Sequence, residues 1–357
     1  MSSFRCGRMR GLLGPASWRC GISLVFAAAL ACATGPPPPP RWNHPEVALA
    51  WPEHPESAWI EYMGVLRTSA DLGRKPSLYE RIKNAVFGTE QEALLKPIAV
   101  AKNAAGVLAV SDPSLSVVHL FDLDRRAYSR IGEGSTSFLR SPIGVAIDDS
   151  GHIYVADSVL GKIFVFDANR NLVAEFGEGE LTRPTGVALD PMQEHLYVVD
   201  TVGCEVLVFD LSGRVVNRFG RRGVGPAEFN APTFIAVAPD GSISVSDSLN
   251  FRVQRFRPDG TPIASFGLPG DGAGHFARPK GIATDTAGRI YVVDAGFENV
   301  QIFAPDGALL LHFGGPGAGP GELALPGGLF IDSTNTIWVA DMYNRRIQVF
   351  RLMADAP

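Results

Sequence analysis

The chain has 357 residues and a formal net charge of −5, with 46% hydrophobic and 19% charged residues, 39 glycines and 27 prolines. This apolar content is enough for a sizeable core, and the Gly and Pro content favours short strands and turns over long helices. The charge excludes the basic footprint that nucleic-acid binding requires. The cysteines lack the paired short spacings of a zinc site or a disulfide framework: Cys6, Cys20, Cys32 and Cys204.

The first 31 residues have the features of an export signal. Four arginines between positions 5 and 19 precede the apolar run 21–31. That run is short for a membrane-spanning helix and suits the core of a signal peptide. We therefore assign residues 1–31 to a signal peptide, whose removal would leave a more acidic chain.

The end of this segment allows two cleavage sites. Ala29-Leu30-Ala31 matches the small-x-small rule and predicts a soluble secreted protein. Leu30-Ala31-Cys32 resembles a bacterial lipobox, although Ala29 stands where leucine is usual, and predicts a lipoprotein lipidated on Cys32. We favour the lipoprotein because residues 36–40 are five consecutive prolines, which form a stiff extended tether. An uncleaved anchor is the third alternative.

Residues 32–57 are accordingly expected to form a Pro-rich tether. The apolar stretch 58–67 is expected to form a strand. Between this strand and the repeats, 68–94 is a predicted linker. It contains an expected amphipathic helix over 77–87, in which Ser77 and Glu80 form a capping box and Leu78, Ile82 and Val86 form an apolar stripe. This helix either packs on one end of the domain or docks on a membrane or a partner.

Residues 95–350 contain six repeats, which start near positions 95, 140, 182, 230, 277 and 324 and leave a tail at 351–357. Each repeat begins with a proline and an apolar strand, and its second strand ends in aspartate. The six leading prolines are Pro97, Pro142, Pro184, Pro232, Pro279 and Pro326. The six aspartates are Asp112, Asp157, Asp200, Asp247, Asp294 and Asp341.

Four strands per repeat and a period of more than forty residues predict an all-β, six-bladed propeller with four antiparallel strands per blade. The sixth repeat lacks its fourth strand, because the chain ends soon after Phe350. An open edge there would promote aggregation. We therefore expect strand 58–67 to complete the sixth blade and close the ring.

The loops after the second strands carry a recurrent pattern. Repeat four reads Asp247-x-x-Asn250-x-Arg252-x-Gln254, and repeat six has the same residues at the same spacing from Asp341. With the Pro-x-Gly-Ile/Val-Ala starts, this pattern resembles the NHL repeat family of six-bladed propellers over residues 95–350. The Trp-Pro-x-x-Pro lead-in at 51–55 is similar to that of bacterial lipoprotein-type members. The resemblance implies the propeller fold and leaves the ligand open.

Function is expected at the end of the ring that carries the second-to-third loops and the connections between blades, because these vary most. Aromatic side chains and arginines suit binding hot spots. The candidates are Arg221, Arg222, Phe251, Arg252, Phe297, Glu298, Tyr343, Arg345 and Arg346. For Arg252 and Arg346 the alternative is a structural pairing with Asp247 and Asp341. The six repeated aspartates could ring a cation, but bonding to loop N–H groups explains them more simply.

Enzymes related to the NHL family hold zinc through histidines or a central divalent cation through Glu, Asn and Asp. The seven histidines of this chain do not share one register of the repeat, so we expect no metal, no cofactor and no catalytic residue. We therefore predict a non-catalytic binding platform of the bacterial cell envelope, which presents one propeller face to a protein, peptide or glycan. A metal-dependent hydrolase or lyase with an axial site is the alternative. We expect a membrane-anchored lipoprotein, or else a soluble secreted protein, with no nucleic-acid partner.

Overall fold

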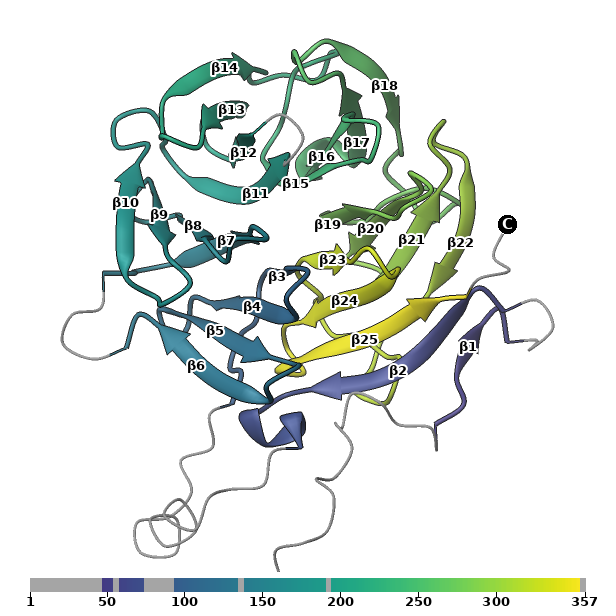
Figure 1. Cartoon of the computed structure of the whole chain (residues 1–357). Helices are drawn as coiled ribbons and strands as arrows, with labels where there is room; N and C mark the ends of the chain where they lie inside the picture. The colour runs from purple at the N-terminus through teal and green to yellow at the C-terminus, as the bar shows by residue number, and fades with distance from the viewer. Residues whose placement is uncertain (1–46, 54–57, 74–92, 134–137, 191–193, 354–357) are drawn as a thin grey trace, which may run out of the picture. The chain divides into compact units, whose positions relative to one another are not determined.

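The computed structural model describes residues 47–53, 58–73, 93–133, 138–190 and 194–353. These residues form six antiparallel sheets arranged as blades around a central axis (Figure 1). The all-β six-bladed propeller with four strands per blade is therefore confirmed. The predicted helix over 77–87, the signal peptide and Cys32 lie outside the described residues. Among the described residues, no helix is long and apolar enough to cross a membrane.

The blades are numbered by their order in the chain. The strands of each blade are given from the innermost, next to the axis, to the outermost. Blades 1 to 3 contain β3 (Val100–Lys102), β4 (Val107–Asp112), β5 (Val117–Asp122) and β6 (Ala127–Ile131); β7 (Pro142–Ile147), β8 (Ile153–Asp157), β9 (Lys162–Phe166) and β10 (Leu172–Phe176); and β11 (Pro184–Asp190), β12 (His195–Asp200), β13 (Glu205–Asp210) and β14 (Val215–Phe219).

Blades 4 to 6 follow the same plan, and the sixth includes strands from the start of the chain. They contain β15 (Pro232–Val237), β16 (Ile243–Asp247), β17 (Arg252–Phe256) and β18 (Pro262–Phe266); β19 (Pro279–Thr284), β20 (Ile290–Asp294), β21 (Asn299–Phe303) and β22 (Leu309–Phe313); and β23 (Leu329–Ile331), β24 (Thr336–Asp341), β25 (Arg346–Leu352), β2 (Ile60–Leu66) and β1 (Ala50–Trp51).

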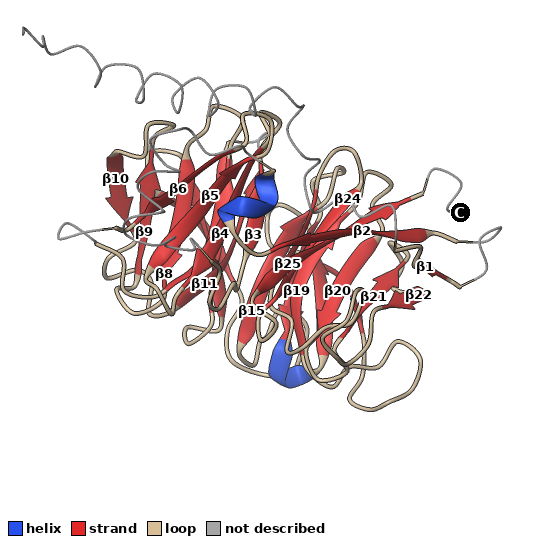
Figure 2. Cartoon of the chain, turned by 90° about the horizontal axis from the view of Figure 1, so that it is seen from below, coloured by secondary structure: helices blue, strands red, loops and turns tan. Residues whose placement is uncertain are grey.

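The core lies between the blades. Middle strands such as β8 and β20 are buried along their whole length, because their two faces cover different neighbours. Six apolar clusters result, one at each interface between adjacent blades. This arrangement explains why the strands are nearly continuously apolar in sequence. Figure 2 shows the strands of neighbouring blades stacked in this way.

The predicted closing strand is confirmed. β2 pairs antiparallel with β25, with Tyr62 opposite Phe350 and Leu66 opposite Ile347. The sixth blade goes further than expected, because β1 pairs with β2 as a fifth strand. Trp51 of β1 packs against Phe313 and Phe350 at ring-centroid distances of 6.0 and 5.8 Å. Part of the segment assigned to the tether, 32–57, thus belongs to the sheet.

The first strands come very close together where they begin. A Cβ atom added to Gly144 of β7 would lie 1.9 Å from the Thr185 carbonyl oxygen of β11. On the other side of the ring, Gly328 donates its N–H to the Ile98 carbonyl at 2.6 Å, which links blades 6 and 1. Glycine at the third position of the Pro-x-Gly motif therefore allows the six inner strands to meet around the axis.

We predict that Gly144→Ala lowers the free energy of unfolding by at least about 2 kcal/mol, since the new methyl group must push two backbones apart. Gly315→Ala is the matched control, because an added Cβ there meets no atom within 4 Å. Urea denaturation of both variants measures the difference. Equal stability of the two variants would contradict the close approach of β7 and β11.

Candidate functional site

The strand register defines two ends of the ring. Pro142, at the start of β7, pairs with Asp157 at the end of β8, and Pro279 pairs with Asp294 in the same way. The second-to-third loops and the entrances to the inner strands therefore share one end, here called the loop end. The first-to-second and third-to-fourth turns share the other, here called the turn end.

The six repeated aspartates are buried at the loop end and hold its loops. Asp157 accepts hydrogen bonds from the backbone N–H groups of Arg140 and Ser141 at 2.6 and 3.0 Å, and from those of Val159 and Leu160 at 3.1 Å. The other five carboxylates also accept loop N–H groups. Each aspartate therefore ties the start of its blade to the second-to-third loop, which is the structural role expected for them.

Blades 4 and 6 add an ion pair to this clamp. Arg252 and Arg346 donate from Nε to Asp247 and Asp341 at 2.9 and 2.6 Å. Arg346, with a side chain only 2% exposed, also donates to three carbonyls of the connection before its blade. The assignment of Arg346 to a ligand-facing surface is therefore wrong, and half-buried Arg252 has the same structural role. Both arginines satisfy loop carbonyls that would otherwise lack donors.

The other candidates differ in their freedom to face a partner. Tyr343 is 66% exposed and Arg345 is exposed beside it. Arg221 and Arg222 are exposed too, although Arg221 pairs with Glu228 at 2.8 Å. The remaining three are half-buried: Phe251, Phe297 and Glu298. Glu298 accepts the Leu325 N–H at 2.9 Å, which ties it to the next connection.

The structure reveals a feature that the sequence analysis missed, here called the apolar ring. Each second-to-third loop places an apolar side chain two or three residues after its buried aspartate. In five blades this side chain is exposed, whereas Phe297 of the fifth is half-buried. The exposed members are Leu115, Val159, Leu160, Val202, Leu249 and Tyr343. Aligning the six repeats on their aspartates would have shown this pattern.

Basic side chains lie inside the apolar ring, next to the prolines that start the inner strands. Lys96, Arg140, Arg183 and Arg278 are exposed there, and Lys280 is half-buried. Burial lowers the pKa of Lys280, and the positive charges of Arg278 and Lys96 lower it further. The loop end thus concentrates positive charge near the axis although the whole chain is acidic.

The described residues contain no group of three or more His, Cys, Asp or Glu side chains that could hold a metal ion. Cys204 is buried as a free thiol at an interface between blades.

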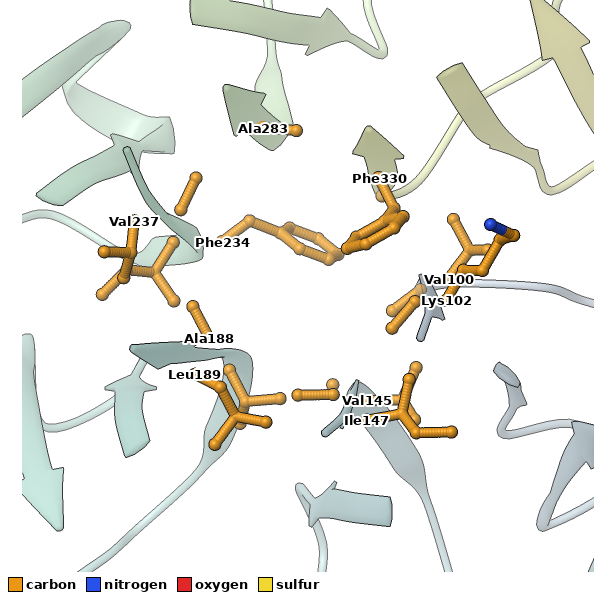
Figure 3. Close-up of a pocket in the computed structure, with 18 of the residues that line it drawn as sticks. Val100, Lys102, Val145, Ile147, Ala188, Leu189, Phe234, Val237, Ala283 and Phe330 are labelled. Atoms are coloured by element: carbon orange, nitrogen blue, oxygen red, sulfur yellow. The ribbon is translucent and has the colours of Figure 1, made fainter. Parts of the chain in front are cut away.

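A cavity of about 450 Å³ lies on the axis and is lined by the inner strands of all six blades (Figure 3). It extends to the turn end, where Asp149, Ser150 and Glu194 contribute to its lining. The sequence analysis favoured the loop end and named the axis only as the alternative site of a metal-dependent enzyme; it did not predict an apolar cavity there. The alanines that recur at the fifth position of the inner-strand motif were the available sign, because small side chains leave the axis open.

Two family models match parts of the chain. One, described as NHL repeat, matches residues 139–166, and the other, described as 6-bladed beta-propeller, matches residues 282–355. No curated protein matches the sequence.

Solved structures share the fold at low identity. A structural genomics protein of unknown function from Bacteroides thetaiotaomicron is 17% identical, with a TM-score of 0.57 over 73% of this chain and 70% of that one. Virginiamycin B lyase from Staphylococcus aureus is 15% identical, with a TM-score of 0.55 over 72% and 95% of the two chains. A putative gluconolactonase is 16% identical, with a TM-score of 0.55 over 72% and 89%. These similarities establish the fold and carry no activity over to this chain.

Substitution of a buried clamp residue and of an exposed loop residue should have very different effects on stability. Asp341→Asn leaves the buried Arg346 without its counter-charge, so we expect a loss of about 3 kcal/mol in the free energy of unfolding. Tyr343→Ser, two residues away, removes an exposed ring and should change stability by less than about 0.5 kcal/mol. Chemical denaturation measures both values. A destabilised Tyr343 variant would show that this ring supports the loop and is not free for a partner.

Proposed function

From the premise that this chain is a six-bladed β-propeller with NHL repeats, we propose that it is a binding platform of the bacterial cell envelope. Its working surface is the loop end, and its partner is an acidic protein or peptide. The proposal is supported above all by the apolar ring, which repeats in register around that end. Single exposed apolar residues are ordinary, but this set recurs at a corresponding position of the loop in five of the six blades, all at one end of the ring.

The position of the ring follows from the aspartate clamp. Asp157 and Asp200 each accept the N–H of the residue two positions later at 3.1 Å, in the manner of an Asx turn. The turn fixes the backbone, so Val159 and Val202 project into solvent without a packing role in the blade. Val159 is 69% exposed as a result. Such rigidly held apolar groups can be buried by a partner at little entropic cost.

The chemistry of the surface selects the class of partner. Tyr343 and Arg345 are the residue types that dominate hot spots between proteins. The cations Lys96, Arg183 and Arg278 lie inside the ring and favour a partner with carboxylates. Apolar anchors combined with positive charge suit an acidic polypeptide better than a neutral glycan.

The binding test uses affinity capture from envelope extracts with three forms of the protein. The loop-end variant carries Val159→Ser, Leu249→Ser and Tyr343→Ser. The matched control carries Val173→Ser, Val216→Ser and Ile263→Ser, which remove three exposed apolar groups from the outer strands β10, β14 and β18. We expect the wild type and the control to retain the same partner and the loop-end variant to lose it.

Binding of the captured partner to the loop end should also weaken as the salt concentration is raised from about 0.05 to 0.5 M, because salt screens the attraction exerted by the positive charges. A partner lost equally from both triple variants, or retained by both, would refute the assignment of the loop end. Binding that is insensitive to salt would refute an acidic partner.

The envelope location rests on residues 1–40, which lie outside the described residues. The apolar run 21–31, Cys32 and the prolines at 36–40 support export and a lipid anchor that holds the propeller away from the membrane on a stiff tether. A lipidated N-terminal cysteine carries more than one acyl chain, and more than one acyl chain is needed for stable anchoring in a membrane.

We predict that radiolabelled palmitate is incorporated into the wild-type protein and into Cys204→Ser, and not into Cys32→Ser. Because Cys204 is buried in the propeller, its substitution controls for the loss of a thiol without touching the N-terminus. The Cys32 variant should also move from the membrane fraction to the soluble fraction. A wild-type protein without label would support soluble secretion instead.

A further inference from the structure

The axial cavity is a separate space with its own chemistry. Its walls come from the six inner strands and are mainly apolar, with Val145, Leu189 and Val237 among them (Figure 3). A volume of about 450 Å³ lies within the range of small-molecule sites. The candidate loop residues named above do not line it, so a ligand here would be independent of the proposed loop-end partner.

In two of the inner strands a phenylalanine stands where most other blades have glycine or alanine. Phe234 stands where four other blades have the third-position glycine of Pro-x-Gly, and Phe330 stands where the other five blades have alanine. They come from blades 4 and 6. Figure 3 shows their rings next to each other at the axis. A Cβ atom added to Gly328 would lie 2.8 Å from Cε1 of Phe234, so the ring reaches across to the sixth blade.

The two rings stand at the axis, and Phe234 lies with Gly144 and Gly328 in the part of the lining nearest the loop end. At the turn end the lining includes the exposed Asp149 and Glu194. A ligand would therefore enter from the turn end and meet a floor of two phenyl rings, opposite to the surface proposed for the protein partner.

The entrance to the cavity carries mainly negative charge. Lys102 is the sole cationic side chain among the described lining residues, and it pairs with Asp332 at 3.0 Å. Burial would raise the pKa of Asp332, but hydrogen bonds from Thr334 and Thr336 and the Lys102 ammonium outweigh it and lower that pKa. The Asp332 carboxylate is therefore ionised at neutral pH and is paired with Lys102. The exposed carboxylates of Asp149 and Glu194 then set the sign of the entrance.

We propose that the axial cavity binds a small amphiphilic cation: an organic ammonium whose apolar or aromatic body rests on Phe234 and Phe330 and whose charged group lies among the carboxylates of the turn end. The apolar body gains from leaving water. The ammonium group keeps its solvation at the entrance and gains attraction from the carboxylates.

Three probes of matched size test the charge preference: 3-phenylpropylammonium, 3-phenylpropanol and 3-phenylpropionate. We expect calorimetry at low salt to give binding in the order ammonium, alcohol, carboxylate, with the ammonium roughly tenfold tighter than the alcohol. Failure of all three probes to bind at millimolar concentration would overturn the proposal. Equal affinity of the ammonium and the alcohol would overturn the role of the carboxylates.

Variants locate the binding. Ala188→Phe places in blade 3 the residue that blade 6 already carries at this position, so it should fill the cavity and abolish binding of every probe. The double variant Asp149→Asn with Glu194→Gln changes exposed side chains only and should remove most of the preference for ammonium over alcohol. Asp306→Asn, an exposed turn residue outside the cavity lining, is its matched control.

Thermal denaturation establishes that each variant is folded before binding is measured. Should Ala188→Phe fail to fold, Phe330→Ala replaces it. That variant restores the alanine of the other blades, removes half of the aromatic floor and should weaken all three probes. Unchanged binding in a folded Ala188→Phe or Phe330→Ala protein would place the probes elsewhere and refute the axial site. Loss of probe binding should leave capture by the loop end intact, so the two proposals fail separately.

Discussion

The close approach of six inner strands at the loop end is the constraint on which the rest of the molecule depends. There Gly144 lies against the Thr185 carbonyl and Gly328 bonds to that of Ile98, so there is no space for a side chain between neighbouring blades. Because every blade must reach the axis, each inner-strand motif begins with a proline, at or just before the strand, and has a small residue two positions later in most blades. Phe234 is the exception, and its ring stands at the axis, where the glycines of other blades leave room.

The same constraint explains why the aspartates are buried. The segment that enters this narrow region has backbone N–H groups with no partner in a neighbouring strand, and unsatisfied groups of this kind are costly. The carboxylate of each second strand accepts them. Where the preceding connection is long and rich in glycine, its carbonyls need donors, and Arg346 and Gln348 supply them from the adjacent strand. One aspartate thus organises the entrance, the loop and the exposed residue that follows it.

The sequence was sufficient to predict the architecture because the repeat is a physical unit. Each period carries the same strands and the same clamp, and the missing strand of the sixth unit leaves an edge that only 58–67 could cover. The two-residue strand β1 was missed because a strand of that length has no detectable hydrophobic period. Its place in the sheet is evident only from the contact that Trp51 makes with the neighbouring blade. Arg252 and Arg345 look alike in sequence, but one pairs inside the loop and the other is exposed. Side-chain direction decides that difference, and it depends on a left-handed backbone at Arg345.

The axial cavity was hidden for a related reason. A single repeat shows alanine at the fifth position of the inner strand and gives no hint that five alanines face one space, because the ring brings them together from positions far apart in the chain. The departures at Phe234 and Phe330 acquire meaning only when all six repeats are superposed. A closed ring also separates its two ends: the loop end carries the apolar ring and the cations next to the prolines, and the turn end carries the carboxylates that line the cavity. In the two proposals the ends take ligands of opposite charge, so neither ligand would compete for the end that the other occupies.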